Sequence, residues 1–243
     1  MDRFLTHRRA LIVGGSGGIG AEVSRALARN GASLVVHGGH DREKLEAVAA
    51  AAREEGVEVV TLLREIVRAE DGLAILEASV PVDILIVSFG PYLEAGLHQT
   101  GVDEWKRLIE LNLTLPALLL SCVLRQMRKR GYGRIVVFGG PRGDRLEGYT
   151  TIGAYGAAKH GLASLVRSAA LQYAADHIRV NMICPGYVAT EYYEPQRIAE
   201  IARALPDKRA VSTSEVAALV VQLLRPESDA VNGAVIPMDF GFR

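Results

Sequence analysis

The stretch Val13-Gly14-Gly15-Ser16-Gly17-Gly18-Ile19-Gly20 decides the fold of this chain. It follows the apolar run Ala10–Val13 and opens a segment of helical periodicity, Gly18–Asn30. Glycines at such a junction let the backbone turn tightly, approach a pyrophosphate closely and pack the helix near the strand. The N–H groups at the start of the helix then face the phosphates. The stretch therefore predicts a dinucleotide-binding turn, and a purely structural glycine-rich turn is the alternative.

Short apolar runs alternate with helical segments over the rest of the chain. Most of the runs are continuously apolar and β-branched, as strands buried on both faces are. They are Ser33–His37, Val57–Leu63, Val82–Ser88, Ile135–Phe138, Ile178–Cys184 and Ala234–Met238. The expected helices are Asp41–Glu55, Asp103–Arg130, Ala154–Ala175 and Thr213–Leu224, the last opened by the capping box Ser212–Glu215. This alternation predicts an α/β fold of the Rossmann type, with a doubly wound, parallel, seven-stranded sheet and helices on both faces.

Composition excludes several classes of protein. The chain has 243 residues, 49% of them hydrophobic, and 28 basic residues balance 28 acidic ones. These values predict one globular domain over residues 1–243, without a nucleic-acid or membrane partner. Two cysteines, Cys122 and Cys184, cannot form a disulfide framework, and the N-terminus lacks the apolar core of a signal peptide. We therefore expect a cytoplasmic protein.

Two polar, irregular stretches follow strand ends and are candidate walls or lids of a site. The first is Gly139–Gly153, and the second is Glu191–Arg203, which contains a break at Pro195. In an open α/β sheet the ligand lies beyond the carboxyl ends of the strands, where both stretches begin. We expect residues 190–212 to form a lid over the substrate.

The end of the second strand, His37-Gly38-Gly39-His40-Asp41-Arg42, bears on the choice of dinucleotide. An acidic residue at this strand tip holds the ribose hydroxyls of NAD. None stands at the tip here, and Asp41 is better explained as a helix cap. The basic side chains, His37 among them, suit a 2′-phosphate, so the sequence favours NADP(H) over NAD(H). A metal site at His37 and His40 lacks a suitably spaced third ligand.

Tyr155 and Lys159 are four residues apart, on one face of an expected helix. A phenol titrates near pH 10 and is a poor acid–base group at neutral pH. A nearby cation lowers that pKa, and the phenol can then protonate a carbonyl oxygen as hydride reaches the carbon. The spacing is also common on solvated helix faces, so the pair gains weight only from its context.

Taken together, these motifs resemble those of the short-chain dehydrogenases/reductases over essentially the whole chain. The matching features are the glycine-rich turn, Asn112, Tyr155-x-x-x-Lys159, Pro185-Gly186-Tyr187-Val188-Ala189-Thr190, Pro206–Arg209 and Asn232–Asp239. Within the family, the layout is similar to that of 3-oxoacyl-carrier-protein reductases and related ketoreductases. The resemblance implies hydride transfer between a nicotinamide cofactor and a carbonyl substrate.

The resemblance also implies roles for individual residues. Tyr155 would be the proton donor in reduction, Lys159 would bind the nicotinamide ribose and lower the pKa of Tyr155, and Asn112 would hold a water of a proton relay. Pro185, Gly186 and Val188 would pack beside the nicotinamide, and Thr190 would bind its carboxamide. The other expected cofactor contacts are Gly14, Ser16, Gly17, Gly18, Ile19, His37, Glu65, Ile66, Ser88 and Gly90.

The main departure from the family pattern is a missing serine that would hydrogen-bond the substrate carbonyl. Counting forward from the preceding strand puts Gly140 at its position, and counting back from Tyr155 puts Arg142 there. Neither has a hydroxyl, and losing such a donor costs about 10²–10³ in rate. Either Thr150, Thr151 or Arg142 substitutes for it, or catalysis is weak or absent, or the substrate supplies its own positioning. Other departures are Val87-Ser88-Phe89-Gly90 after the fourth strand, Glu65 near the adenine, and Val13 before the first glycine.

The leading hypothesis is an NADP(H)-dependent reductase of a ketone, with a 3-oxoacyl thioester on acyl carrier protein or coenzyme A as one candidate. The alternatives are a dinucleotide-binding protein with impaired or no catalysis, and different chemistry at the same site. Trp105, Tyr92, Tyr192 and Tyr193 are candidates to line the substrate pocket, and the tyrosines near the lid, Tyr192 among them, are favoured. The cluster Arg125–Arg134 either stabilises a helix end or docks an acidic partner. The resemblance implies a homotetramer or homodimer.

Overall fold

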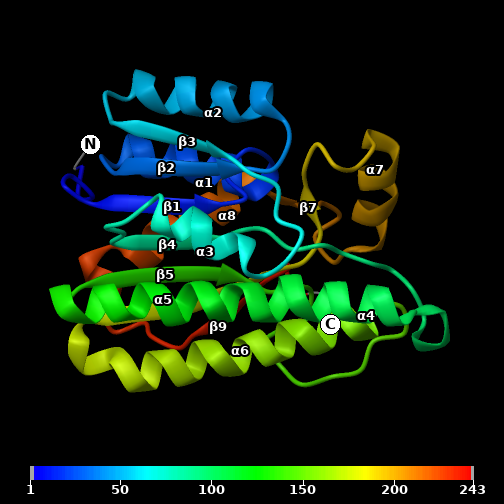
Figure 1. The fold of residues 1–243 in the computed structure, drawn as a ribbon. Helices are drawn as coiled ribbons and strands as arrows, with labels where there is room; N and C mark the ends of the chain where they lie inside the picture. The colour runs from blue at the N-terminus through cyan, green and yellow to red at the C-terminus, as the bar shows by residue number, and fades with distance from the viewer. Residues whose placement is uncertain (1–2, 242–243) are drawn as a thin grey trace.

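Seven parallel strands form one sheet with the order β3-β2-β1-β4-β5-β6-β9 in the computed structural model, which describes residues 3–241 (Figure 1). The strands are β1 (Arg9–Val13), β2 (Ser33–Gly38), β3 (Val59–Leu63), β4 (Ile84–Val87), β5 (Gly133–Phe138), β6 (Ile178–Pro185) and β9 (Val235–Met238). All seven were predicted, within a few residues at each end. Their β-branched residues are buried because helices cover both faces of the sheet.

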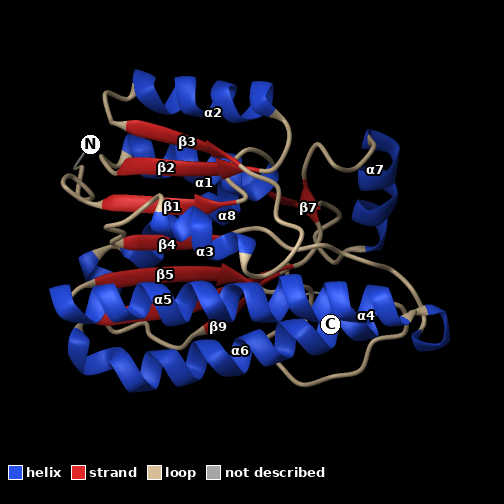
Figure 2. Cartoon of the chain, in the orientation of Figure 1, coloured by secondary structure: helices blue, strands red, loops and turns tan. Residues whose placement is uncertain are grey.

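Helices cover the sheet in two layers (Figure 2). One layer holds α1 (Gly18–Arg29), α2 (Arg42–Glu54) and α8 (Thr213–Leu224). The other holds α3 (Asp71–Glu77), α4 (Val102–Ile109), α5 (Leu115–Arg130) and α6 (Gly153–Tyr173). Short 3₁₀ turns lie at Leu97–Gln99, Ala174–Asp176 and Pro226–Ser228. The Rossmann-type single domain predicted from the sequence is thus confirmed, and its core consists of two apolar clusters, one on each face of the sheet.

Strand order reverses at β1, which pairs with β2 on one side and β4 on the other. Loops that leave the carboxyl ends of β1 and β4 therefore diverge to opposite faces and leave a crevice between them. The glycine-rich turn leaves β1 at this point. The segment that contains α7 (Pro195–Ala204) lies beyond the same ends of the strands (Figure 2).

Two expectations about the helices need correction. The segment Asp103–Arg130 is not one regular helix, because a π-helical turn, Glu110–Thr114, joins α4 to α5. The stretch Glu191–Arg203 is not irregular throughout, because Pro195 begins α7 instead of breaking the chain. Proline fits the first turn of a helix, where its missing N–H would have no intrahelical partner.

A two-stranded sheet, β7 (Val188–Ala189) and β8 (Val211–Ser212), was not predicted. Val188 pairs with Val211 and Ala189 with Ser212. These pairs bring together the two ends of residues 190–212. The segment therefore projects from a fixed base, immediately before the capping box that opens α8.

Helices α4 and α5 with the π-turn between them, Val102–Arg130, are long and apolar enough to cross a membrane by length and composition. Half of the apolar window is buried within the domain, because α5 packs on β5 and β6 between its neighbours α3 and α6, and α4 packs on α6. The stretch therefore belongs to the core of the α/β domain.

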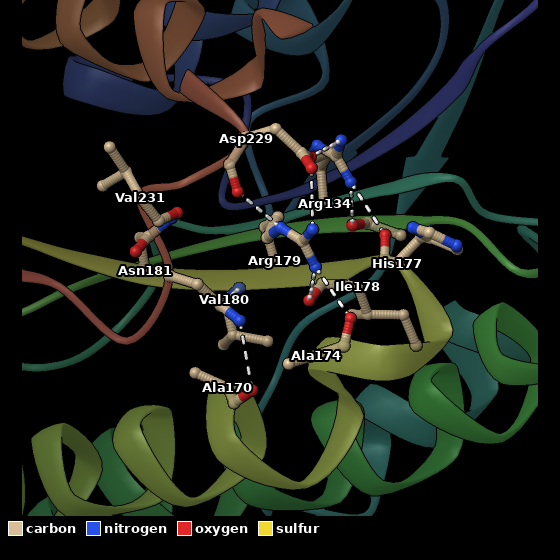
Figure 3. Close-up of polar contacts among 12 residues, drawn as sticks. Arg134, Ala170, Ala174, His177, Ile178, Arg179, Val180, Asn181, Asp229 and Val231 are labelled. Atoms are coloured by element: carbon tan, nitrogen blue, oxygen red, sulfur yellow. Dashed lines mark hydrogen bonds and ion pairs between the residues drawn. The ribbon is translucent and has the colours of Figure 1, made fainter. Parts of the chain in front are cut away.

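An ion cluster ties β5 and β6 to the chain that leads into β9 (Figure 3). The Asp229 carboxylate accepts hydrogen bonds from Arg134 Nη2 at 2.6 Å and from Arg179 Nη2 at 2.7 Å. Arg134 and Arg179 lie near the amino ends of their strands, so this cluster is at the end of the sheet opposite to the crevice.

Candidate active site

A pocket opens at the carboxyl ends of β1, β4, β5 and β6. Seventeen residues line it, and they are Ile19, Ser88, Phe89, Gly90, Tyr92, Phe138, Gly139, Gly140, Pro141, Tyr155, Lys159, Pro185, Gly186, Tyr187, Val188, Thr190 and Tyr193. Nine of these are residues that the sequence assigned to catalysis or cofactor binding. The fold thus brings together residues of α1, β5, α6, β6 and β7 and of the loops that follow the strands.

Tyr155 and Lys159 point into this pocket from the first turns of α6. The Tyr155 hydroxyl donates to the Gly139 carbonyl oxygen at 3.4 Å, and Lys159 Nζ donates to the Phe138 carbonyl oxygen at 2.9 Å. Lys159 Nζ lies 5.5 Å from the centre of the Tyr155 ring. Both partners are backbone atoms at the end of β5, so the strand end fixes the two side chains.

Burial decides the acid–base properties of this pair. It raises the pKa of Tyr155 above its ordinary value, and it lowers the pKa of Lys159 to about 8. The predicted lowering of the Tyr155 pKa by Lys159 is therefore absent from this structure. Its cause is geometric, because the ammonium is directed to the Phe138 carbonyl and not to the phenol oxygen. Tyr155 is a protonated donor at neutral pH.

Asn112 lies in the π-turn, and its side chain is completely buried. Its Nδ2 donates to the Pro91 carbonyl oxygen at 2.9 Å, whereas Oδ1 has no hydrogen-bond partner among the described residues. A Cβ atom at Gly90 would collide with that oxygen and would lie 3.5 Å from Lys159 Nζ. A buried acceptor without a partner beside Lys159 has the character of a site for a bridging water.

The glycine-rich turn is supported from two sides. Gly14 has a φ of +80°, in the region that favours glycine, and a Cβ at Gly20 would collide with the Gly14 carbonyl oxygen. Ser88 donates from its hydroxyl to the carbonyl oxygens of Val13 and Gly14, both at 3.0 Å. The unusual sequence after β4 therefore keeps one side chain that fixes the turn.

His37 does not have the position that its proposed contact with a 2′-phosphate requires. Its side chain is buried beneath the turn, where Nδ1 accepts from the Gly14 N–H at 3.2 Å and Nε2 lies 2.7 Å from the Arg64 carbonyl oxygen. Burial lowers its pKa, so it is neutral at pH 7. With both ring nitrogens engaged by backbone, His37 supports the glycine-rich turn and the prediction of a phosphate contact is wrong.

The start of α1 has the charge and the N–H groups, free of intrahelical partners, that suit a dinucleotide pyrophosphate. The first turn of α1 has no acidic residue, and its N-cap, Gly17, has no side chain. A carboxylate from a distant segment takes the role of the missing acidic residue. Glu191 Oε1 accepts a hydrogen bond from the Gly18 N–H at 2.9 Å. An anion already sits on the donors that a pyrophosphate would use, so the charge and geometry of the turn fit the phosphates.

The missing hydroxyl is not replaced by the residues proposed for that role. Gly140 is the residue beside Tyr155, since a Cβ there would lie 2.6 Å from Tyr155 Cε1. Arg142 pairs with Glu147 at 3.6 Å, and Thr150 and Thr151 are exposed and outside the pocket. Gly139, Gly140 and Pro141 of this loop line the pocket, and the Tyr149 hydroxyl donates to the Pro141 carbonyl oxygen at 2.9 Å.

Sequence reasoning gave too little weight to the aromatic residues of the pocket. The Tyr92 ring packs edge-on against Tyr155, with centroids 5.3 Å apart and planes 77° apart. Burial raises the pKa of Tyr92, so its phenol is also protonated at neutral pH. Of the two lid tyrosines favoured from the sequence, Tyr193 lines the pocket, whereas Tyr192 is 69% exposed and lies over the glycine-rich turn. Tyr92 was one of the candidates from the sequence, but no motif placed it beside Tyr155.

The remaining predicted cofactor residues divide into two groups. Pro185, Gly186, Val188 and Thr190 line the pocket at the end of β6 and along β7. Ile66 is instead buried in the core, so its side chain packs inside the domain, and Glu65 is exposed. Of the basic cluster, Arg128, Arg130 and Arg134 pair with Asp176, Asp83 and Asp229, which favours a structural role.

Comparison with known proteins agrees with this arrangement. The family model described as "Enoyl-(Acyl carrier protein) reductase" matches residues 14–243. The cis-4-hydroxycyclohexanecarboxylate dehydrogenase of Sinomonas cyclohexanicum is 33% identical over 250 residues, which cover 100% of this chain and 99% of that protein. An acetoacetyl-CoA reductase of Rhizobium meliloti is also 33% identical, with 96% and 98% covered.

Among solved structures, a 3-oxoacyl-(acyl-carrier-protein) reductase from Agrobacterium tumefaciens with NADP bound superposes with a TM-score of 0.90. It is 27% identical, and the match covers 99% of this chain and 96% of that one. A levodione reductase superposes with a TM-score of 0.88 at 29% identity, with 98% of each chain covered.

Proposed function

The chain belongs to the short-chain dehydrogenase/reductase family, and on that premise we propose that it reduces a ketone to an alcohol with NADP(H), Tyr155 donating the proton. The observation that carries the proposal is the position of Tyr155 and Lys159, side by side against the end of β5 in a pocket beyond the glycine-rich turn. A nicotinamide cofactor, when bound, supplies the hydride that adds to the carbonyl carbon.

The residues of the chain carry out the proton half of this reaction. As the carbonyl oxygen gains negative charge, the Tyr155 hydroxyl gives it a proton, and the product is the alcohol. Lys159 and a water at Asn112 Oδ1 would return a proton to the phenolate. Burial raises the pKa of Tyr155, so the proton donor is protonated at neutral pH.

The cofactor would lie along the crevice from the glycine-rich turn to the pocket. Gly14, Ser16, Gly17, Gly18 and Ile19 would hold the phosphates and ribose, and Pro185 to Thr190 would border the nicotinamide. NADP(H) is favoured because the tip of β2 has no acidic residue, while Arg42 and Lys44 are exposed at the start of α2. The NADP-bound structural neighbour supports the same choice.

The substrate class is a small or acyl-type ketone, with a coenzyme A or carrier-protein thioester among the candidates. Two similar proteins, an acetoacetyl-CoA reductase and a 3-oxoacyl-carrier-protein reductase, support this substrate class. Residues 190–212 would cover the substrate, and a homotetramer or homodimer in the cytoplasm is the expected setting. A protein that binds dinucleotide without catalysis is the second candidate, and the absence of a hydroxyl at Gly140 favours it.

Turnover tests the proposal directly. NADPH or NADH consumption is followed by absorbance against a panel of acetoacetyl thioesters, diketones and cyclic ketones. We expect saturable turnover with at least one carbonyl and a preference for NADPH. Binding of NADPH without consumption in the presence of any carbonyl would support the second candidate instead.

A further inference from the structure

Residues 190–193 fold back over the glycine-rich turn. The hydrogen bond from the Gly18 N–H to Glu191 Oε1 joins residues that are 173 positions apart in the chain. The ring of Tyr192 lies beside it, since a Cβ at Gly18 would be 3.0 Å from Tyr192 Cε2 and one at Gly17 would collide with the Tyr192 hydroxyl. Two consecutive side chains therefore occupy the surface that α1 offers to an anion.

The contact has an electrostatic cause. The amino end of α1 carries a partial positive charge and N–H groups without intrahelical partners. No acidic side chain of α1 itself meets that charge in the first turn. The Glu191 carboxylate interacts with this positive end of α1 instead, in a hollow that Arg25 and Lys44 also line. A pyrophosphate needs the same N–H groups, so the carboxylate and the cofactor cannot both use them.

We propose that Glu191 is a tethered competitor of the dinucleotide: its carboxylate occupies the pyrophosphate position and must leave before the cofactor binds. This inference rests on the proposed cofactor site and adds a residue that sets its affinity. Because the segment begins at β7 and its far end pairs through β8, release of Glu191 moves a loop whose base stays fixed.

The same movement reaches the catalytic pocket. Thr190 and Tyr193 line that pocket, and the Tyr193 N–H donates to the Thr190 carbonyl oxygen at 3.2 Å, so the four residues form one turn. Displacement of Glu191 therefore shifts the wall beside Tyr155. Cofactor entry and reshaping of the substrate pocket therefore become one event.

The experiment measures the dissociation constant of NADPH for the full-length protein by ligand fluorescence. Glu191→Gln removes the charge and keeps the shape, and Glu191→Ala removes the contact. Glu194→Gln is the matched control, because Glu194 is exposed on the same segment and its side chain has no hydrogen bond within the described residues. Amide hydrogen exchange at Gly18, without cofactor, reports the contact itself.

We expect both Glu191 variants to bind NADPH about three- to tenfold more tightly than the wild-type protein, the range that one part-exposed, charge-assisted contact supports. Exchange at Gly18 accelerates in Glu191→Ala, and Glu194→Gln changes neither quantity. Unchanged or weaker NADPH binding in both Glu191 variants overturns the inference while the proposed function stands. Equal tightening in Glu194→Gln also overturns it, because general charge repulsion would then be the cause. Absence of NADPH binding in every form of the protein overturns both proposals.

Discussion

Two tyrosines define the proposed reaction centre at the scale of single residues. Tyr155 holds the proton, and Tyr92 presents its ring edge-on to Tyr155 at a centroid distance of 5.3 Å. Gly140 contributes no hydroxyl, and the loop beyond it turns away through the contacts of Arg142 and Tyr149. From this ring contact we predict that the phenol of Tyr92 is a second donor to the oxygen of a carbonyl held at Tyr155.

Tyr92→Phe therefore lowers kcat about 10²- to 10³-fold, because one donor to the developing oxyanion is lost. The dissociation constant of NADPH stays the same, since the change is remote from the glycine-rich turn. Steady-state kinetics with the best ketone measures both. Tyr193→Phe, a second pocket tyrosine without a ring contact to Tyr155 among the described residues, is the control, and an equal loss there would refute a specific role for Tyr92.

Single residues were also where sequence reasoning failed most clearly. A histidine at a strand tip suggested a phosphate contact, but a linear pattern does not show whether a ring points outward or under the neighbouring turn. His37 is buried because the turn after β1 crosses it and supplies the Gly14 N–H. Tyr92 and Glu191 had no motif to mark them, and only the fold brings them to Tyr155 and Gly18.

Elements were predicted well wherever a local physical signal existed. The buried strands gave continuous β-branched runs, and the capping box Ser212–Glu215 gave the start of α8, where both of its reciprocal hydrogen bonds are present. The π-turn at Asn112 has no such signal, because no residue type in Glu110–Thr114 marks the change from i→i+4 to i→i+5 hydrogen bonds. Proline at 195 was interpreted as a break because α7 carries little buried apolar surface to mark it as a helix.

The capping box makes a prediction about stability and pH. Hydrogen bonds from Arg209, then from the Ser212 N–H and hydroxyl, lower the pKa of Glu215 to about 2. A carboxyl group with a lowered pKa stabilises the fold above its ordinary pKa near 4.5 and loses that contribution as the pH falls towards 2. The Tm of the wild-type protein, measured in thermal melts, should therefore fall as the pH is lowered from about 4.5 to about 2.

Glu215→Gln should lower the stability at pH 7 by about 1 kcal/mol, the usual worth of a helix cap, and should reduce the dependence on pH below 4.5. Glu227→Gln is the control, because Glu227 is an exposed carboxyl group in the 3₁₀ turn Pro226–Ser228, which follows α8. A wild-type and a Glu215→Gln curve with the same slope between pH 4.5 and 2 would show that the box contributes no acid sensitivity.

At the scale of the whole molecule, one end of the sheet carries an ion cluster and the other end carries the candidate active site. Asp229, Arg134 and Arg179 join β5, β6 and the approach to β9 at the amino ends of the strands. The crevice, the glycine-rich turn and the pocket lie at the carboxyl ends. Alternating strands and helices made this architecture predictable, since parallel crossovers place every strand end on one side. Which residues of the 139–153 loop line the pocket was not predictable, because it depends on side-chain contacts within the loop.

The central claim is that Tyr155 supplies the proton in a dinucleotide-dependent carbonyl reduction, and Tyr155→Phe tests it most directly. NADPH affinity and NADPH consumption are measured side by side for the wild-type and variant proteins with the best ketone. The account predicts that the variant binds NADPH nearly as the wild type does and that its turnover falls at least about 10²- to 10⁴-fold. A Tyr155→Phe protein that reduces the ketone at the wild-type rate would contradict the account.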